Sequence, residues 1–120
     1  MSDSLFKYLQ LFYSSVRFPI QVINKDGKIV YINELFTVQW GYSLSELSEY
    51  SVFKDRELGK MGVQKIIKEV IEQKNYSSIA NYSDSLLINR DAAVPLLRTS
   101  IFPLSFESED YAVLLHEDQT

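Results

Sequence analysis

Hydrophobic residues recur along the chain with two spacings, one typical of helices and one typical of strands. The helical spacing predicts amphipathic helices over residues 4–15 and 60–74, each with one apolar side. The apolar side of the first consists of Leu5, Leu9, Phe12 and Val16, and that of the second of Val63, Ile66, Ile67, Val70 and Ile71.

Two shorter helices are indicated by residues that favour helix ends. Asn33 suits the N-cap of a helix that runs to Trp40, and Gly41 suits the left-handed cap that follows it. Ser43 and Glu46 have the spacing of a capping box, in which each side chain satisfies a free backbone N–H at the helix start. We therefore expect two short helices before the long helix at 60–74.

Alternating β-branched and aromatic residues predict five strands. The first two flank an Asp-Gly pair at 26–27, which is a strong signal for a tight hairpin turn. Counting outward from this turn pairs Val22 with Tyr31 on one face and Ile23 with Val30 on the other. The remaining strands are expected over residues 79–89, 94–104 and 111–116.

The two faces of the predicted sheet differ little in polarity. Gln21 suggests that its own face of the first hairpin is the wetter one. The last strand, however, is apolar on both faces, whereas an antiparallel sheet usually has one solvated face. The central helices can cover one face, and either the helix at 4–15 or a partner subunit is needed for the other.

The composition is that of a single soluble domain. The 120 residues suffice for one domain, and a hydrophobic content of 46% suits a folded core. The absence of cysteine excludes disulfides and, with no signal-peptide pattern, favours a cytoplasmic location. No apolar stretch has transmembrane length, so we expect no direct membrane contact. A net charge of -4 with scattered basic residues argues against binding to nucleic acid.

The order of several motifs resembles that of the PAS domain (sensory box) family of bacterial signalling proteins. The segment PIQVINKDGKIVYIN, followed by ELF and GYSLSEL, resembles the family's opening, and INRDAAVPLLRTSIFPL and YAVLLHEDQT resemble its closing strands. The resemblance implies an α+β fold with a five-stranded antiparallel sheet in the order 2-1-5-4-3, helices on one face that enclose a pocket, and an N-terminal helix. We accordingly divide the chain into a helix for dimerisation or cover at 1–17 and a PAS domain at 18–120.

The resemblance also implies a role in signal transduction. Members of the family bind a small molecule or cofactor, form dimers and regulate an output domain such as a sensor histidine kinase of a two-component system. We therefore expect a non-catalytic sensory domain that acts as a homodimer, with its output domain in the same chain or a partner chain. The sequence agrees, because it has one histidine and no glycine-rich phosphate loop. The alternative is an interaction module with a filled core and dimerisation as its output.

Residues on the predicted inner surfaces are candidates for a ligand pocket. The polar atoms of Tyr31, Trp40, Tyr42 and Thr99 need partners if they are buried, and small-molecule sites contain a few such groups in an apolar wall. The same residue types also form ordinary cores. The candidate pocket consists of Tyr31, Phe36, Trp40, Tyr42, Phe53, Ile67, Leu87 and Thr99.

The residue types restrict the cofactors that the domain could hold. Without cysteine, no covalent flavin adduct can form. Haem-binding members of the family use an axial histidine, commonly on the long helix, and the helix at 60–74 has none. The single histidine, His116, lies at a strand end, where we expect a polar surface residue, so the sequence argues against haem. Noncovalent flavin stays open, and the carboxylates near the C-terminus are expected to form a solvated rim and no metal site.

Asp118 and Thr120 match the D-x-T sequence with which the family leaves its last strand. In that family the motif caps the helix that leads to the output domain, and the side-chain oxygens of Asp and Thr suit a helix N-cap. We therefore expect these two residues to mark the signal exit. The other interpretation is a polar tail.

Overall fold

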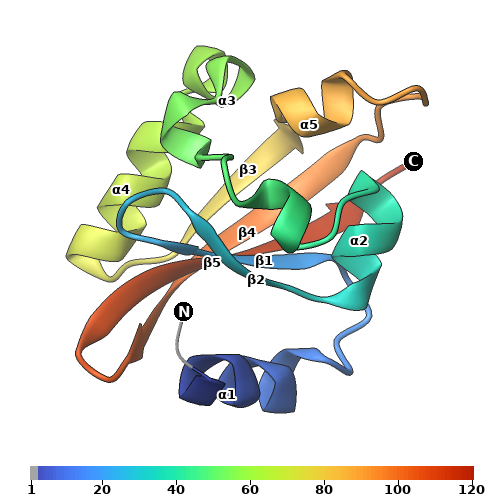
Figure 1. The fold of residues 1–120 in the computed structure, drawn as a ribbon. Coiled ribbons are helices and arrows are strands. Elements are labelled where there is room, and N and C mark those ends of the chain that lie inside the picture. Colours follow the sequence, from blue (N-terminus) through green and yellow to red (C-terminus); the bar gives the residue numbers. More distant parts are fainter. Residues whose placement is uncertain (1–2) are drawn as a thin grey trace.

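The structure is a computed structural model that describes residues 3–120, and its centre is one antiparallel sheet of five strands (Figure 1). The strand order is β2-β1-β5-β4-β3, as predicted. The last strand of the chain therefore lies in the middle of the sheet, between β1 and β4. The strands are β1 Ile20–Asn24, β2 Ile29–Ile32, β3 Ser77–Tyr82, β4 Leu97–Phe106 and β5 Glu109–Asp118.

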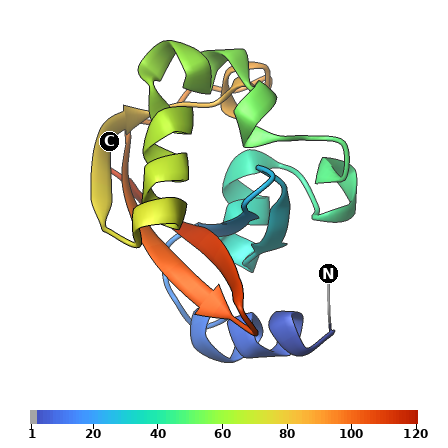
Figure 2. The ribbon, with the colours of Figure 1, turned by 90° about the vertical axis from the view of Figure 1, so that its left-hand side faces the viewer.

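Helices cover both faces of this sheet. The helix α1 lies alone on the outer face, and the remaining helices form a shell over the inner face (Figure 1, Figure 2). This is the α+β arrangement expected from the sequence. The helices are α1 Asp3–Tyr13, α2 Glu34–Trp40, α3 Arg56–Met61, α4 Val63–Gln73 and α5 Ser85–Ile88, with 3-10 helices η1 Ser45–Leu47 and η2 Val52–Lys54.

Local sequence signals account for the first helices of the shell. The side chain of Asn33 accepts a hydrogen bond from Phe36 N, and Gly41 ends α2 with a φ of 83°. Ser43 and Glu46 form the predicted capping box, with 2.8 Å from Ser43 N to Glu46 Oε1 and 3.4 Å from Glu46 N to Ser43 Oγ. Both predictions of helix ends are confirmed.

The β1–β2 hairpin has the predicted turn, but its register differs in one place. Val22 pairs with Tyr31, as expected. Ile23 pairs with Ile29 and not with Val30, because the ladder is irregular between Val22 and Ile23. The counted register is therefore correct on one side of the irregularity and wrong on the other.

The register next to the turn is set by a left-handed glycine that extends the loop by one residue, so that Asn24 N donates to Lys28 O at 2.9 Å. Gly27 has a φ of 84°, and its N–H donates to Asn24 O at 3.0 Å. A Cβ at this position would lie 2.7 Å from side-chain atoms of both Phe53 and Ser51. Backbone conformation and space therefore both require glycine here.

The inner face of the sheet contains the main hydrophobic core. Gln21 lies on this face and is only 1% exposed, so the prediction that its face is the wetter one is wrong. Its amide forms hydrogen bonds with buried polar side chains, and these bonds offset the free-energy cost of burying it. The fully buried apolar side chains of this core include Ile23, Phe36, Trp40, Leu58, Ile67, Leu87, Leu97, Ile101 and Leu114.

The outer face is also covered, because α1 folds back onto its own sheet. Leu5 and Leu9 are buried there in a cluster with Val22 and Val113. The predicted apolar stripe is wrong at Phe12, which is 54% exposed and whose ring contacts Tyr8 at a centroid distance of 5.0 Å. Cover for the outer face thus comes from the helix itself.

Two predicted elements differ in extent. The helix predicted at 60–74 is divided by Gly62, whose left-handed φ of 72° ends α3 before α4 begins. The strand predicted at 79–89 ends at Tyr82, because Asp84 accepts a hydrogen bond from Leu87 N and so starts α5. Local capping by an aspartate side chain prevails over the strand pattern at this point.

Candidate functional site

A series of hydrogen bonds crosses the inner core from the helical shell to the sheet. It runs from Asp84 through Tyr82 and Gln21 to His116, and it ends at Thr99. Each of these five side chains is at most 1% exposed. We call this series the core polar chain. Leaving one such buried group without a partner costs about 1–3 kcal/mol, so the arrangement is strongly specified.

Asp84 joins three elements at the shell end of the core polar chain. Its carboxylate accepts from Trp40 Nε1 of α2 at 3.0 Å and from the hydroxyl of Tyr82 on β3 at 3.1 Å. It also accepts from Leu87 N of α5 at 2.9 Å. Burial raises the pKa of Asp84 to about 6, although these hydrogen bonds act to lower it. The charge of this junction therefore changes near pH 6.

His116 lies at the sheet end of the core polar chain, between two aromatic rings. Its ring centroid is 4.7 Å from that of Trp40 and 4.7 Å from that of Tyr82. Gln21 Nε2 is 2.9 Å from His116 Nε2, and Thr99 Oγ1 is 2.6 Å from Nδ1. Because an amide nitrogen can only donate, Nε2 accepts and Nδ1 carries the proton that is donated to Thr99.

The surroundings of His116 keep its imidazole neutral. Burial lowers the pKa of His116 to about 3, because the charged form would lose its hydration in the core. The prediction that His116 is a polar surface residue is wrong, since the side chain is 0% exposed and shares the inner side of β5 with Ala112 and Leu114. In this position it contributes to packing and hydrogen bonding together.

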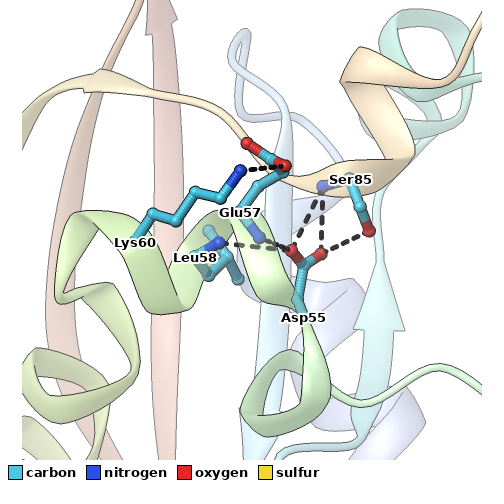
Figure 3. A network of polar contacts seen from close by, with 5 residues as sticks. All are labelled: Asp55, Glu57, Leu58, Lys60 and Ser85. Atoms are coloured by element: carbon cyan, nitrogen blue, oxygen red, sulfur yellow. Dashed lines mark hydrogen bonds and ion pairs between the residues drawn. The ribbon is translucent and has the colours of Figure 1, made fainter.

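A second buried carboxylate, that of Asp55, ties neighbouring helices of the shell together (Figure 3). Its Oδ1 accepts from the backbone N of Glu57 and of Leu58 at the start of α3. Its Oδ2 accepts from Ser85 Oγ of α5 at 2.7 Å and from the hydroxyl of Tyr50 at 2.6 Å. Since Ser85 follows Asp84 in the sequence, this junction adjoins the shell end of the core polar chain.

The two carboxylates differ in their preferred charge. Burial raises the pKa of Asp55, but hydrogen bonds from Tyr50, Ser85 and Leu58 outweigh burial and hold the pKa below its ordinary value. At Asp84 burial prevails. Asp55 is therefore a fixed negative charge, and Asp84 is the member of the pair that can gain a proton.

Most of the predicted pocket residues come together in the inner core. Phe36 and Trp40 stack with ring centroids 4.2 Å apart and an interplanar angle of 9°. Ile67 and Leu87 are buried in the same cluster, and Thr99 ends the core polar chain. The last two members on this face, Tyr42 and Phe53, are partly buried against it.

Tyr31 does not belong to this group. Its side chain is buried on the outer face of the sheet beneath α1, where its ring centroid is 5.9 Å from that of Phe6. Val22, its partner in the hairpin, lies on the same face. The prediction that Tyr31 lines the inner pocket is therefore wrong, because strand alternation turns it away from the shell.

The prediction omitted four members of the core polar chain, namely Gln21, Tyr82, Asp84 and His116. Signals for two of them were present in the sequence. His116 is separated by two and four residues from Leu114 and Ala112, so strand alternation places all three on one face. The signal for Asp84 was its position before SLLI, where an aspartate can cap a short helix.

The core of the candidate pocket is filled by its own side chains. Phe36, Trp40, Ile67, Leu87 and Thr99 are 0–1% exposed. None of them lines any of five pockets found on the surface of the described residues. The largest of these five, of about 550 Å³, lies between the β1–β2 turn, α4 and the β4–β5 hairpin, and Phe53 lines it.

Asp118 and Thr120 form a small turn at the end of β5. Asp118 Oδ1 accepts hydrogen bonds from the hydroxyl of Thr120 and, at 2.9 Å, from Thr120 N. These bonds lower the pKa of Asp118. Gln119 N donates to Leu96 O at 2.7 Å and so fastens the turn to the start of β4. Because His116 lies on the same strand, the core polar chain reaches the strand that ends at this turn.

Residues 3–120 contain neither a transmembrane helix nor a cluster of metal ligands. No helix in this range is long and apolar enough to cross a bilayer. No group of three or more histidine, aspartate and glutamate side chains in the range is arranged to hold a metal ion. The carboxylates of Glu107 and Glu109 lie exposed at the β4–β5 hairpin.

Solved structures share this fold at low sequence identity. A PAS domain of an HTR-like protein from Haloarcula marismortui gives a TM-score of 0.70 at 19% identity, over 93% of this chain and 95% of that one. A PAS domain from a two-component sensor histidine kinase gives 0.68 at 14% identity, over 99% and 100%. VqmA bound to DPO, a protein of Vibrio cholerae, gives 0.69 at 12% identity, over 95% and 57%.

Sequence comparison leads to the same group of proteins. A search of curated proteins gives no match. The family model described as PAS fold, however, matches residues 7–118, a range that contains every strand of the sheet. With this match over nearly its whole length, the chain belongs to the PAS family.

Proposed function

We propose that this chain is a sensory input domain that acts as a cytoplasmic homodimer and regulates an output domain such as a sensor histidine kinase. The observation that carries the proposal is the core polar chain, which connects the helical shell to the strand that ends at Asp118. A change in the shell can in this way alter the exit. Family membership supports the proposal, because PAS domains are common in signalling proteins and one similar structure comes from a sensor histidine kinase.

The input that we propose is a small molecule. VqmA, which has a similar fold, has been solved bound to DPO. A specific observation favours an alternative for the interior of this chain, namely an interaction module without an internal ligand. Phe36 and Trp40 stack in the inner core and, like Ile67, are at most 1% exposed, so their own side chains occupy the region where we expected a pocket.

Native mass spectrometry of freshly purified protein distinguishes the two interior states. We expect the mass of two chains without retained ligand, because the core is filled and because Leu11 and Phe12 of α1, 76% and 54% exposed, offer an apolar surface for association. Retained mass equal to a flavin or another cofactor would contradict the filled core. A monomer at micromolar concentration would contradict the homodimer.

Alteration of the exit is expected to change the output without unfolding the domain. The suitable protein is a sensor histidine kinase in which this chain replaces the native PAS domain, joined at the D-x-T sequence. Asp118→Ala removes the acceptor of both bonds from Thr120. Loss of a cap of this kind costs about 0.5–2 kcal/mol, so we expect autophosphorylation to change by about 2- to 30-fold.

The matched control for this variant is Gln119→Ala, which changes the exposed residue between Asp118 and Thr120 and keeps the backbone bond to Leu96. We expect it to leave autophosphorylation at the unmodified level. If the two variants have the same effect, Asp118 has no special role at the exit. Circular dichroism of both variants checks that the domain stays folded.

A further inference from the structure

The pocket of about 550 Å³ is lined by side chains of both charges and by two apolar side chains. Its three bordering segments, the β1–β2 turn, α4 and the β4–β5 hairpin, all face the viewer in Figure 2. The volume lies within the range of about 300–1,000 Å³ that is typical of small-molecule sites. The lining residues are Lys25, Phe53, Lys68, Ile71, Glu72, Ser108, Glu109 and Asp110.

Four charged side chains of this pocket form no ion pair. Within residues 3–120, the ion pairs are Lys60 with Glu57 and Lys74 with Asp110. The remaining charged groups of the pocket wall therefore have no oppositely charged atom within 4.0 Å, although they share one concave space. They are the cations Lys25 and Lys68 and the anions Glu72 and Glu109. A small molecule with one positive and one negative group can pair with charges of both signs in this pocket.

Two apolar side chains line the pocket, and one cation lies over the ring of the first. Lys68 Nζ lies 4.8 Å from the ring centroid of Phe53, a cation–π contact between two residues of the pocket wall. Beside Phe53, the side chain of Ile71 is 6% exposed. An apolar side chain of a ligand can contact these two residues while its charged end reaches Lys68.

We propose that this pocket binds a small zwitterion with an apolar side chain, of the size of an amino acid, whose carboxylate meets Lys68 and whose ammonium group meets Glu109. The inference deepens the proposed input function, on which it rests for its role in signalling, by placing the ligand at the surface and outside the filled interior. Lys68 belongs to α4 and Glu109 begins β5, so the bound ligand joins the shell to the strand that leads to Asp118.

The first test uses L-leucine as the probe on the whole chain labelled with nitrogen-15. At millimolar concentration, we expect shifts of the backbone amide signals of residues 68–72 and 108–110. N-acetyl-L-leucine lacks the ammonium group and L-leucinamide lacks the carboxylate. Each is expected to bind about two- to fivefold more weakly, as for the loss of one partly exposed ion pair.

Matched variants test the two named contacts. Lys68→Gln and Glu109→Gln should each weaken L-leucine binding by about two- to fivefold. Lys65→Gln on the same helix and Glu107→Gln in the same hairpin change the same charges outside the pocket lining and should bind as the unaltered chain does. The proposal is overturned if L-leucine causes no shifts in these segments, if both capped probes bind as tightly as L-leucine, or if the pocket variants bind L-leucine as the control variants do.

This experiment separates the inference from the function on which it rests. Binding is measured on the chain alone, whereas the effect of Asp118→Ala is measured on kinase activity. Absence of binding with an intact effect of Asp118→Ala overturns only the zwitterion site. Binding of L-leucine with no difference between Asp118→Ala and Gln119→Ala confirms the site and refutes the proposed route to the output.

Discussion

Replacement of His116 by alanine is expected to lower the free energy of unfolding by about 3–5 kcal/mol. The imidazole packs between the rings of Trp40 and Tyr82, so its removal leaves a cavity in the inner core. The variant also removes one of the two partners of Gln21 Nε2 and the histidine partner of Thr99 Oγ1, both of which are buried. Cavity formation and unsatisfied polar groups act in the same direction, and urea unfolding followed by circular dichroism measures their sum.

A second variant separates the loss of packing from the loss of hydrogen bonds, and a third serves as the control. His116→Phe fills the site with a somewhat larger ring that has no hydrogen-bonding atoms, so no cavity forms and we expect a smaller loss of about 1–3 kcal/mol. Gln119→Ala is the control, because an exposed residue beyond the strand should change stability by less than about 0.5 kcal/mol. A loss for His116→Ala no greater than that of the control would contradict the buried position of the imidazole.

The second large effect is a compensation between His116 and Asp84 in acid. The pKa of His116 falls from 6.5 to about 3 on folding, so the unfolded state binds the proton more readily and stability is lost as the pH falls below 6.5. The pKa of Asp84 rises from 3.8 to about 6, so the native state binds the proton more readily and stability is gained as the pH falls below about 6. Between about pH 6 and 3.8 the two contributions cancel.

Removal of either group is expected to reveal the contribution of the other. In His116→Phe, stability relative to the unaltered chain should rise by about 3 kcal/mol as the pH falls from 6 to 4. In Asp84→Asn, relative stability should fall by about 3 kcal/mol over the same interval. Urea unfolding at several pH values gives these differences, and the other carboxylates cancel in the comparison. Parallel pH profiles for all three proteins would rule out the compensation.

The elements that the sequence predicted best are those whose signals are local. The caps at Asn33 and Gly41 and the capping box at Ser43 satisfy backbone groups within a few residues of themselves, so no knowledge of the fold is needed to read them. The errors arose where one local signal competes with another. At Gly62 a helix end interrupts an apolar stripe, and at Asp84 a helix cap interrupts a strand pattern.

The candidate site was harder to predict, because its members come from distant parts of the chain. Gln21 and His116 are 95 positions apart in the sequence, yet they meet through neighbouring strands. The expected strand order placed β1 beside β5 and β5 beside β4, and the faces of His116 and Thr99 follow from alternation. The sequence did not indicate the register in which β4 and β5 pair. This register places Thr99 directly opposite His116.

The central position of β5 also affects the time at which the domain can fold during synthesis. In the sheet, β1 reaches β4 only through β5, so the hairpin β1–β2 and the pair β3–β4 remain separate until residues 109–118 have left the ribosome. Until then each half has an unpaired apolar edge, which is the condition under which nascent chains aggregate. The pairing that closes the gap is long-range and therefore slow to form. Productive folding of this domain is thus expected to wait until β5 has emerged from the ribosome, and chaperones that hold the unfinished sheet should raise its yield.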